Sequence, residues 1–116
     1  MVITKGQRIM SKTDDFEYVA ERVSDEVMLE QLAEELTEAA HAALKLTRKI
    51  RGVNPTPKTM EQCKENFTEE ISDVLLCVQV CSMVDLFDVS DSDEIITKKI
   101  NRWRTRLEEQ YGKDDC

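Results

Sequence analysis

Two pairs of carboxylates in this sequence have a spacing that could do chemistry. Glu35 and Glu38 stand three residues apart in LAEELTEAAHAAL. Glu70 and Asp73 have the same spacing in EEISDVLL. Residues three apart in a helix are neighbours on one surface, so each pair presents two carboxylates together. Four carboxylates repel one another unless a cation lies between them, and sets of oxygen ligands favour Mg²⁺ or Mn²⁺. The two pairs therefore predict a divalent-metal site if the fold brings them together.

The second pair opens a segment that is almost wholly apolar through Val84. At about 100° per residue, Asp73 lies on the same helix face as Val80, and Glu70 lies on the face of Cys77. Both carboxylates therefore point toward residues that the fold must bury. Charges directed at a core are costly unless they are paired or bind a metal, so this placement strengthens the prediction of a cation site.

Amphipathic spacing predicts the helices that must position the two pairs. The segment before Gly52 repeats apolar residues at intervals of three and four and carries cations in its last turn, as is typical of a helix C-terminus. Both prolines fall in the loop at residues 52–59. Two helices joined by so short a loop pack antiparallel most easily, which would bring the middle of one to the early part of the other. The expected helices cover residues 13–24, 25–51, 60–87 and 92–110.

The predicted fold class is all-α, a bundle of three long helices plus a short N-terminal helix. A single domain is expected over residues 13–112, after a flexible N-terminus at 1–12 and before a C-terminal tail at 113–116. Three Gly and two Pro in 116 residues favour helices over a sheet. Residues 74–84 are apolar on nearly every side, which predicts that the chain oligomerises through the bundle, as a homodimer or a homotetramer.

Charge and hydropathy argue against several classes of protein. The net charge of −8 disfavours binding of nucleic acid or of an anionic membrane surface. No apolar run is long enough to span a membrane and the N-terminus lacks a signal-peptide core, which predicts a cytoplasmic protein. Of the four cysteines, Cys77 and Cys81 lie one helical turn apart in the apolar segment, which is typical of buried, reduced thiols.

At the paired carboxylates the sequence resembles the MazG-like all-α nucleoside triphosphate pyrophosphohydrolases. EELTE, with Glu35 and Glu38, is similar to the E-x-x-E motif of that family. EEISDVLL, with Glu70 and Asp73, is similar to its E-x-x-D motif. The flanking segments QLAEELTEAAHAALKL, RGVNPTP and KINRW further resemble small, often phage-associated members. The resemblance covers roughly residues 16–110.

The resemblance implies a Mg²⁺-dependent enzyme built as an oligomeric helical bundle. It implies metal ligands at Glu35, Glu38, Glu70 and Asp73, and cleavage of a nucleoside triphosphate to the monophosphate and pyrophosphate. Bound Mg²⁺ neutralises phosphate oxygens and lowers the pKa of a coordinated water. A carboxylate that the metal does not fully use could accept the proton of that water, and Glu38 or Glu35 is the expected base.

The expected fourth helix carries basic residues that could bind phosphate. Family members often have a lysine or asparagine and an arginine there, and KKINRWRTR offers Lys98, Asn101, Arg102 and Arg106. Lys98, Arg102 and Arg106 follow each other at intervals of four and so share one helix face, as a phosphate clamp requires. The alternative is a solvated face whose cations pair with nearby glutamates.

Two further interpretations of the acidic helices stay open. Glu38 and His41 form an E-x-x-H, the ligand spacing of ferritin-like di-metal bundles. That design needs two such motifs, however, and His41 is the only histidine in the chain. A non-catalytic helical interaction protein would account for the charge-rich helices without a metal, although it leaves Glu70 and Asp73 among apolar neighbours unexplained.

Overall fold

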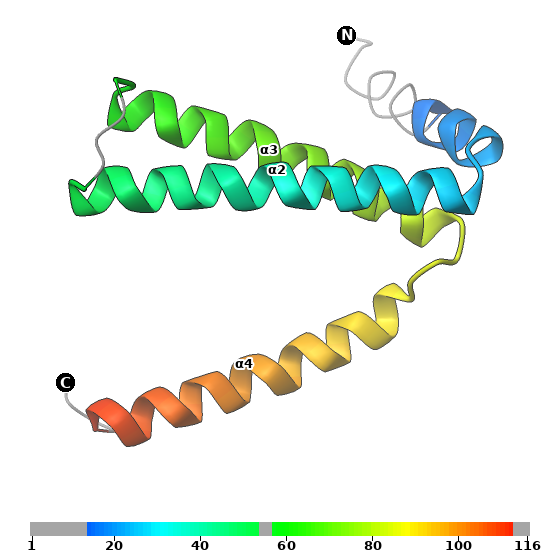
Figure 1. Cartoon of the computed structure of the whole chain (residues 1–116). Helices are drawn as coiled ribbons and strands as arrows, with labels where there is room; N and C mark the ends of the chain where they lie inside the picture. The colour runs from blue at the N-terminus through cyan, green and yellow to red at the C-terminus, as the bar shows by residue number, and fades with distance from the viewer. Residues whose placement is uncertain (1–13, 54–56, 113–116) are drawn as a thin grey trace, which may run out of the picture. The chain divides into compact units, whose positions relative to one another are not determined.

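The computed structural model describes residues 14–53 and 57–112, and these residues are all-α (Figure 1). A short helix at residues 14–22 precedes three long helices, and the described residues contain no strand. The expected fold class, three long helices plus a short N-terminal one, is confirmed. The expected flexible N-terminus at 1–12 and the tail at 113–116 lie outside the described residues. The long helices are α2 (Asp25–Arg51), α3 (Met60–Met83) and α4 (Val89–Tyr111).

Helix α2 begins and ends where the sequence predicts, because both of its ends are capped. The side chain of Ser24 accepts a hydrogen bond from the backbone N–H of Val27 at 3.3 Å, which satisfies one of the free donors at the helix start. Gly52 adopts a left-handed conformation with φ 72°, and its N–H bonds to the carbonyl oxygens of Arg48 and Lys49. A residue without a Cβ adopts this conformation at low cost, so the helix ends there.

Helix α3 ends at Met83, four residues before the predicted end at Phe87. Asp85 takes a left-handed conformation with φ 61°, and the N–H of Leu86 turns back to the carbonyl of Cys81 at 2.9 Å. This is the hydrogen bonding of a Schellman motif, which ends a helix even without glycine when a short polar residue occupies the left-handed position. Leu86 then packs on the core instead of continuing the helix.

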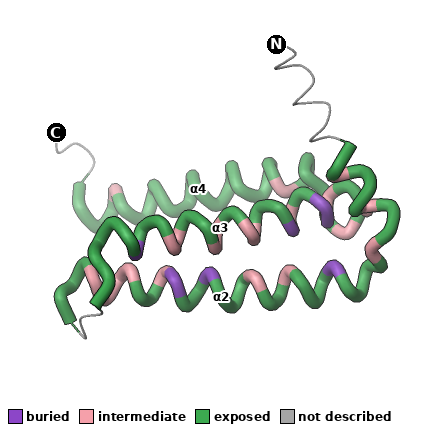
Figure 2. Tube along the Cα trace, turned by 90° about the horizontal axis from the view of Figure 1, so that it is seen from above, coloured by how far each residue is buried: buried purple, intermediate pink, exposed green. Residues whose placement is uncertain are grey.

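Helices α2 and α3 pack antiparallel, as the short connection predicts (Figure 1). Met28 near the start of α2 shares a core with Cys77, Val80 and Cys81 near the end of α3, and the short N-terminal helix covers the same core. Buried positions in the described chain fall only on α2 and α3 (Figure 2). The thiols of Cys77 and Cys81 are free and buried, as expected.

Helix α4 belongs to a second compact unit that starts at Phe87. It begins at Val89, three residues before the predicted start, because the side chain of Asp88 accepts a hydrogen bond from the N–H of Asp91 at 2.9 Å and so caps the helix. No residue of α4 is buried, and its apolar side chains at Ile96, Ile100 and Trp103 are exposed. None of the described helices is long and apolar enough to cross a membrane.

Candidate metal centre

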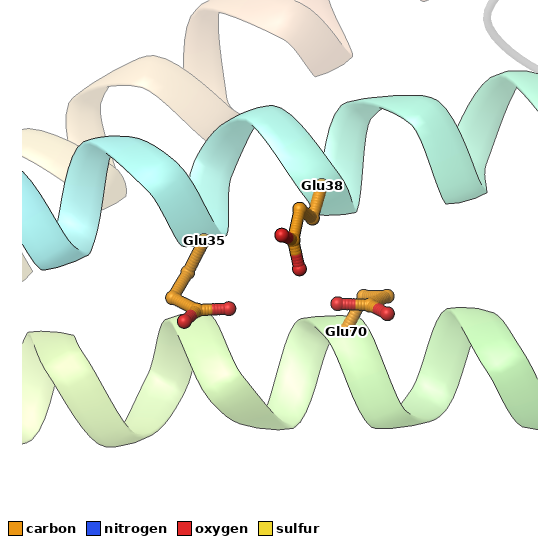
Figure 3. Close-up of side chains that lie close together, drawn as sticks. All are labelled: Glu35, Glu38 and Glu70. Carbon is orange, nitrogen blue, oxygen red and sulfur yellow. The ribbon is translucent and has the colours of Figure 1, made fainter.

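Three of the four predicted ligands meet between α2 and α3. Glu35 and Glu38 on α2 and Glu70 on α3 each offer one carboxylate oxygen, and these three atoms lie within 4.8 Å of one another (Figure 3). The antiparallel packing produces this meeting, because it sets the middle of α2 against the middle of α3. Glu35 and Glu38 point toward α3 from consecutive turns of α2, and the carboxyl group of Glu70 on α3 lies next to that of Glu38 (Figure 3).

Glu70 is the carboxylate whose surroundings are least favourable to its charge. Its residue is half-buried, and its Oε1 atom is buried without a hydrogen-bond partner among the described residues. Burial raises the pKa of Glu70, and the negative charges of Glu38, Asp73, Glu69 and Glu35 raise it further. A carboxylate oxygen that is buried, unpaired and surrounded by like charge would be stabilised by a cation at that point.

Glu35 differs from the other two carboxylates in accepting a side-chain hydrogen bond. Its Oε2 accepts a hydrogen bond of 2.6 Å from Nε2 of Gln31, one turn earlier on the same helix. Sequence reasoning did not include Gln31, although its position four residues before Glu35 would have identified it. Glu38 is exposed, so it remains open to solvent and to a ligand.

Asp73, the fourth predicted ligand, does not belong to this group of three oxygen atoms. It is half-buried one turn after Glu70, close enough for its charge to raise the pKa of Glu70. One turn after Asp73 on α3, burial raises the pKa of the Cys77 thiol, and the charges of Glu35, Cys81 and Asp73 raise it by smaller amounts. The four predicted carboxylates thus lie on α2 and α3, three of them with oxygen atoms within 4.8 Å of one another and Asp73 one turn further along α3 than Glu70.

The donor set fits a hard divalent cation. All three oxygen atoms come from carboxylates, which suits Mg²⁺ or Mn²⁺ better than zinc. The orphaned Oε1 of Glu70 supplies the position that such an ion would satisfy. His41 is exposed and belongs to no group of metal-ligating side chains among the described residues, so nothing in the described structure favours the ferritin-like interpretation.

The predicted phosphate-binding residues all lie exposed on α4. Solvent reaches all four residues on this helix, which lies in the second compact unit: Lys98, Asn101, Arg102 and Arg106. The cation that does pair with a glutamate is Arg104, whose Nε donates to Glu108 at 3.1 Å. The three cations of the predicted stripe take part in no ion pair within residues 57–112.

The chain matches no family model, no curated protein and no solved structure.

Proposed function

We propose that this protein is a Mg²⁺-dependent nucleoside triphosphate pyrophosphohydrolase, which cleaves an NTP or dNTP to the monophosphate and pyrophosphate. Two observations on the same residues carry the proposal. One carboxylate oxygen each of Glu35, Glu38 and Glu70 lies within 4.8 Å of the others, and Oε1 of Glu70 is buried without a hydrogen-bond partner among the described residues. The resemblance of the two acidic motifs to those of the MazG-like family supports the same function.

The charge of the chain supports a role for metal in substrate binding. A triphosphate is highly anionic, and this chain has a net charge of −8. Its sequence has no G-x-x-x-x-G-K loop to hold phosphates through backbone N–H groups and a lysine. When bound at the three glutamates, Mg²⁺ would neutralise phosphate oxygens and lower the pKa of a coordinated water.

The surroundings of each carboxylate indicate whether it would bind the metal or accept a proton. Glu70 is half-buried and unpaired, which suits a metal ligand. Gln31 holds Glu35 in one orientation, which also suits a ligand. Glu38 is exposed and is therefore the better placed of the two candidate bases to accept a proton from water. Asp73, one turn after Glu70 on α3, is the fourth ligand that the resemblance implies.

In the proposed reaction, water attacks the α-phosphorus of the triphosphate. The oxygen of water forms a bond to the α-phosphorus, and its proton passes to the carboxylate of Glu38. The bond between the α-phosphorus and the oxygen that bridges to the β-phosphate breaks, and pyrophosphate leaves with that oxygen. The predicted phosphate-binding residues of α4 would bind phosphate oxygens. Guanidinium and ammonium groups, as in Lys98, Arg102 and Arg106, form strong charge-assisted hydrogen bonds to phosphate, and the amide of Asn101 would donate a neutral one. We expect the active form to be a cytoplasmic homodimer or homotetramer.

The proposal is tested by product analysis. The wild-type protein is incubated with a panel of NTPs and dNTPs, with Mg²⁺ or with EDTA, and the products are separated and identified. We expect monophosphate and pyrophosphate in equal amounts, only with Mg²⁺. Glu70→Gln should abolish turnover, whereas Glu65→Gln, an exposed carboxylate on the same helix, should keep it. Release of orthophosphate, or turnover by Glu70→Gln at the wild-type rate, would contradict the proposal.

A non-catalytic interaction protein is the competing function, and the exposed apolar side chains of α4 favour it. Such a protein would not turn over any nucleotide, and Mg²⁺ would not raise its melting temperature. Failure of every nucleotide in the panel, together with a melting temperature that does not respond to Mg²⁺, would favour this function instead.

A further inference from the structure

The amide of Gln31 contacts the candidate metal centre through one of its carboxylates. Gln31 stands on α2 one helical turn before Glu35, and its Nε2 donates a hydrogen bond of 2.6 Å to Oε2 of Glu35. The bond is shorter than most N–H···O bonds, as is expected when the acceptor is an ionised carboxylate. Residues four apart on a helix are neighbours on its surface. This contact is therefore built into α2 and needs no other element of the chain to form.

The hydrogen bond restrains Glu35 before any cation binds. A free glutamate side chain turns about three bonds, and a metal that binds it must first restrict this rotation. The amide of Gln31 occupies one lone pair of Oε2, whereas an ionised carboxylate offers about four lone-pair sites on its two oxygens. The other oxygen and the rest of Oε2 stay available to a cation. The bond thus sets the direction of Glu35 without using up its capacity as a ligand.

Gln31 orients Glu35 without neutralising it. A lysine or arginine at the same position could also donate to Glu35, but its positive charge would repel a cation that approaches the three carboxylates. The nearest lysine or arginine on α2 is Lys45, ten residues beyond Glu35, which is about 15 Å along the helix axis. The neutral donor therefore leaves the negative charge of the three glutamates to attract the metal.

We infer that Gln31 is a positioning residue of the candidate metal centre, which acts through Glu35 and raises the affinity of the centre for a hard divalent cation. Loss of a partner that binds a ligand, rather than the metal itself, typically costs about 10- to 100-fold in metal affinity or activity. The inference rests on the proposed metal centre and adds to it a residue outside the two acidic motifs. It involves only residues of α2 and α3, which belong to the same compact unit.

Titration with Mn²⁺ alone tests the inference without any nucleotide. The electron paramagnetic resonance signal of free Mn²⁺ disappears on binding, so it gives the dissociation constant directly. Gln31→Met keeps the length of the side chain but removes the donor, and it should weaken Mn²⁺ binding about tenfold. Gln79→Met is the matched control, because Gln79 is an exposed glutamine nine residues beyond Glu70 on α3. This variant should bind Mn²⁺ as the wild type does.

The melting temperature in EDTA separates positioning from a general effect on the fold. Methionine and glutamine have similar helix propensities, and one pair of side chains on a helix surface contributes little to stability. The metal-free melting temperature of Gln31→Met should therefore stay within about 2 °C of the wild-type value. A larger fall in this temperature, with no change in Mn²⁺ affinity, would overturn the inference because Gln31 would then serve only the helix.

Gln31→Lys tests the importance of a neutral donor. Lysine could still donate to Glu35, but its charge would lie beside three carboxylates and reduce their mutual repulsion. We expect the metal-free variant to melt at a higher temperature than the wild type and to bind Mn²⁺ at least tenfold more weakly. Binding of Mn²⁺ by Gln31→Lys at the wild-type affinity would overturn the inference, since a charge at this position would then not affect the centre.

The concentration of Mg²⁺ needed for turnover gives a further measurement. Gln31→Met should need about tenfold more Mg²⁺ for its half-maximal rate and should approach the wild-type rate at saturation, because only metal affinity is lost. Glu38→Gln removes the proposed base and should stay slow at every Mg²⁺ concentration. A rate of Gln31→Met that excess Mg²⁺ does not restore would overturn a role confined to positioning the ligand.

The results separate this inference from the proposed function. If Mn²⁺ binding is lost in Glu70→Gln but unchanged in Gln31→Met, the inference is overturned and the metal centre stands. If Gln31→Met weakens Mn²⁺ binding about tenfold and the wild type hydrolyses no nucleotide, the inference holds and the proposed hydrolase is wrong. A wild-type protein that binds no Mn²⁺ would overturn both.

Discussion

Glu38 on α2 and Glu70 on α3 bring carboxylate oxygens within 4.8 Å of each other across the antiparallel helix pair, and no cation of the described chain lies in an ion pair with either. Burial and the neighbouring carboxylates raise the pKa of Glu70, so the contact opposes folding while both groups are ionised. A proton or a cation that removes the repulsion between these two carboxylates should therefore stabilise the packed helices.

Added Mg²⁺ should raise the melting temperature of the wild-type protein. A ligand that binds only the folded state stabilises it by about 2.7 kcal/mol at a concentration 100 times its dissociation constant. Differential scanning fluorimetry with 0 to roughly 10 mM Mg²⁺, against EDTA, measures the shift. The melting temperature of Glu70→Gln should rise much less with Mg²⁺ than that of Glu65→Gln. An equal response of these two variants would place the cation elsewhere.

Glu70→Gln should stabilise the metal-free protein near neutral pH. The raised pKa means that folded Glu70 holds its proton more tightly than unfolded Glu70, so its contribution to stability is lost as pH rises through the folded pKa. The variant should therefore melt above the wild type at pH 7. That advantage should shrink as the pH is lowered toward 4.5, the ordinary value for glutamate. Melting curves in EDTA from pH 7.5 to 4.5 measure this, and a difference that is independent of pH would contradict it.

Asp73→Asn should remove most of the pyrophosphohydrolase activity and leave the fold intact. The change keeps the shape of the side chain but removes one charge and one good metal ligand. Loss of an outer-shell partner costs about 10- to 100-fold in activity or metal affinity, so loss of a ligand should cost at least that much. Steady-state rates measure the loss of activity, and circular dichroism measures whether the helices are kept. Full turnover by Asp73→Asn, with loss in Glu70→Gln, would restrict the ligand set to the three glutamates.

Val80→Ala should destabilise the protein by about 1–3 kcal/mol, because it leaves a cavity in a core of few side chains. Val80 is 1% exposed and is the largest fully buried side chain of the described residues. Val27→Ala is the matched control, since Val27 is exposed on α2 and its loss should change the free energy of unfolding by less than about 0.5 kcal/mol. Urea denaturation of both variants gives the comparison.

The sequence by itself determined the helices and the pairing of the acids. Apolar spacing identified α2 from end to end, because capping residues stand at both of its ends. It placed the end of α3 four residues late, since Asp85 adopts a left-handed conformation that sequence patterns associate with glycine. The three-residue spacing of the acids likewise predicted Glu35, Glu38 and Glu70 as neighbouring ligands, although it could not give the distances between them.

Only the tertiary structure decided which carboxylates meet. Helical periodicity gives the direction of a side chain around its own axis, but the register between two helices depends on how their apolar surfaces interlock. That register brought Glu70 to Glu35 and Glu38 and left Asp73 one turn aside.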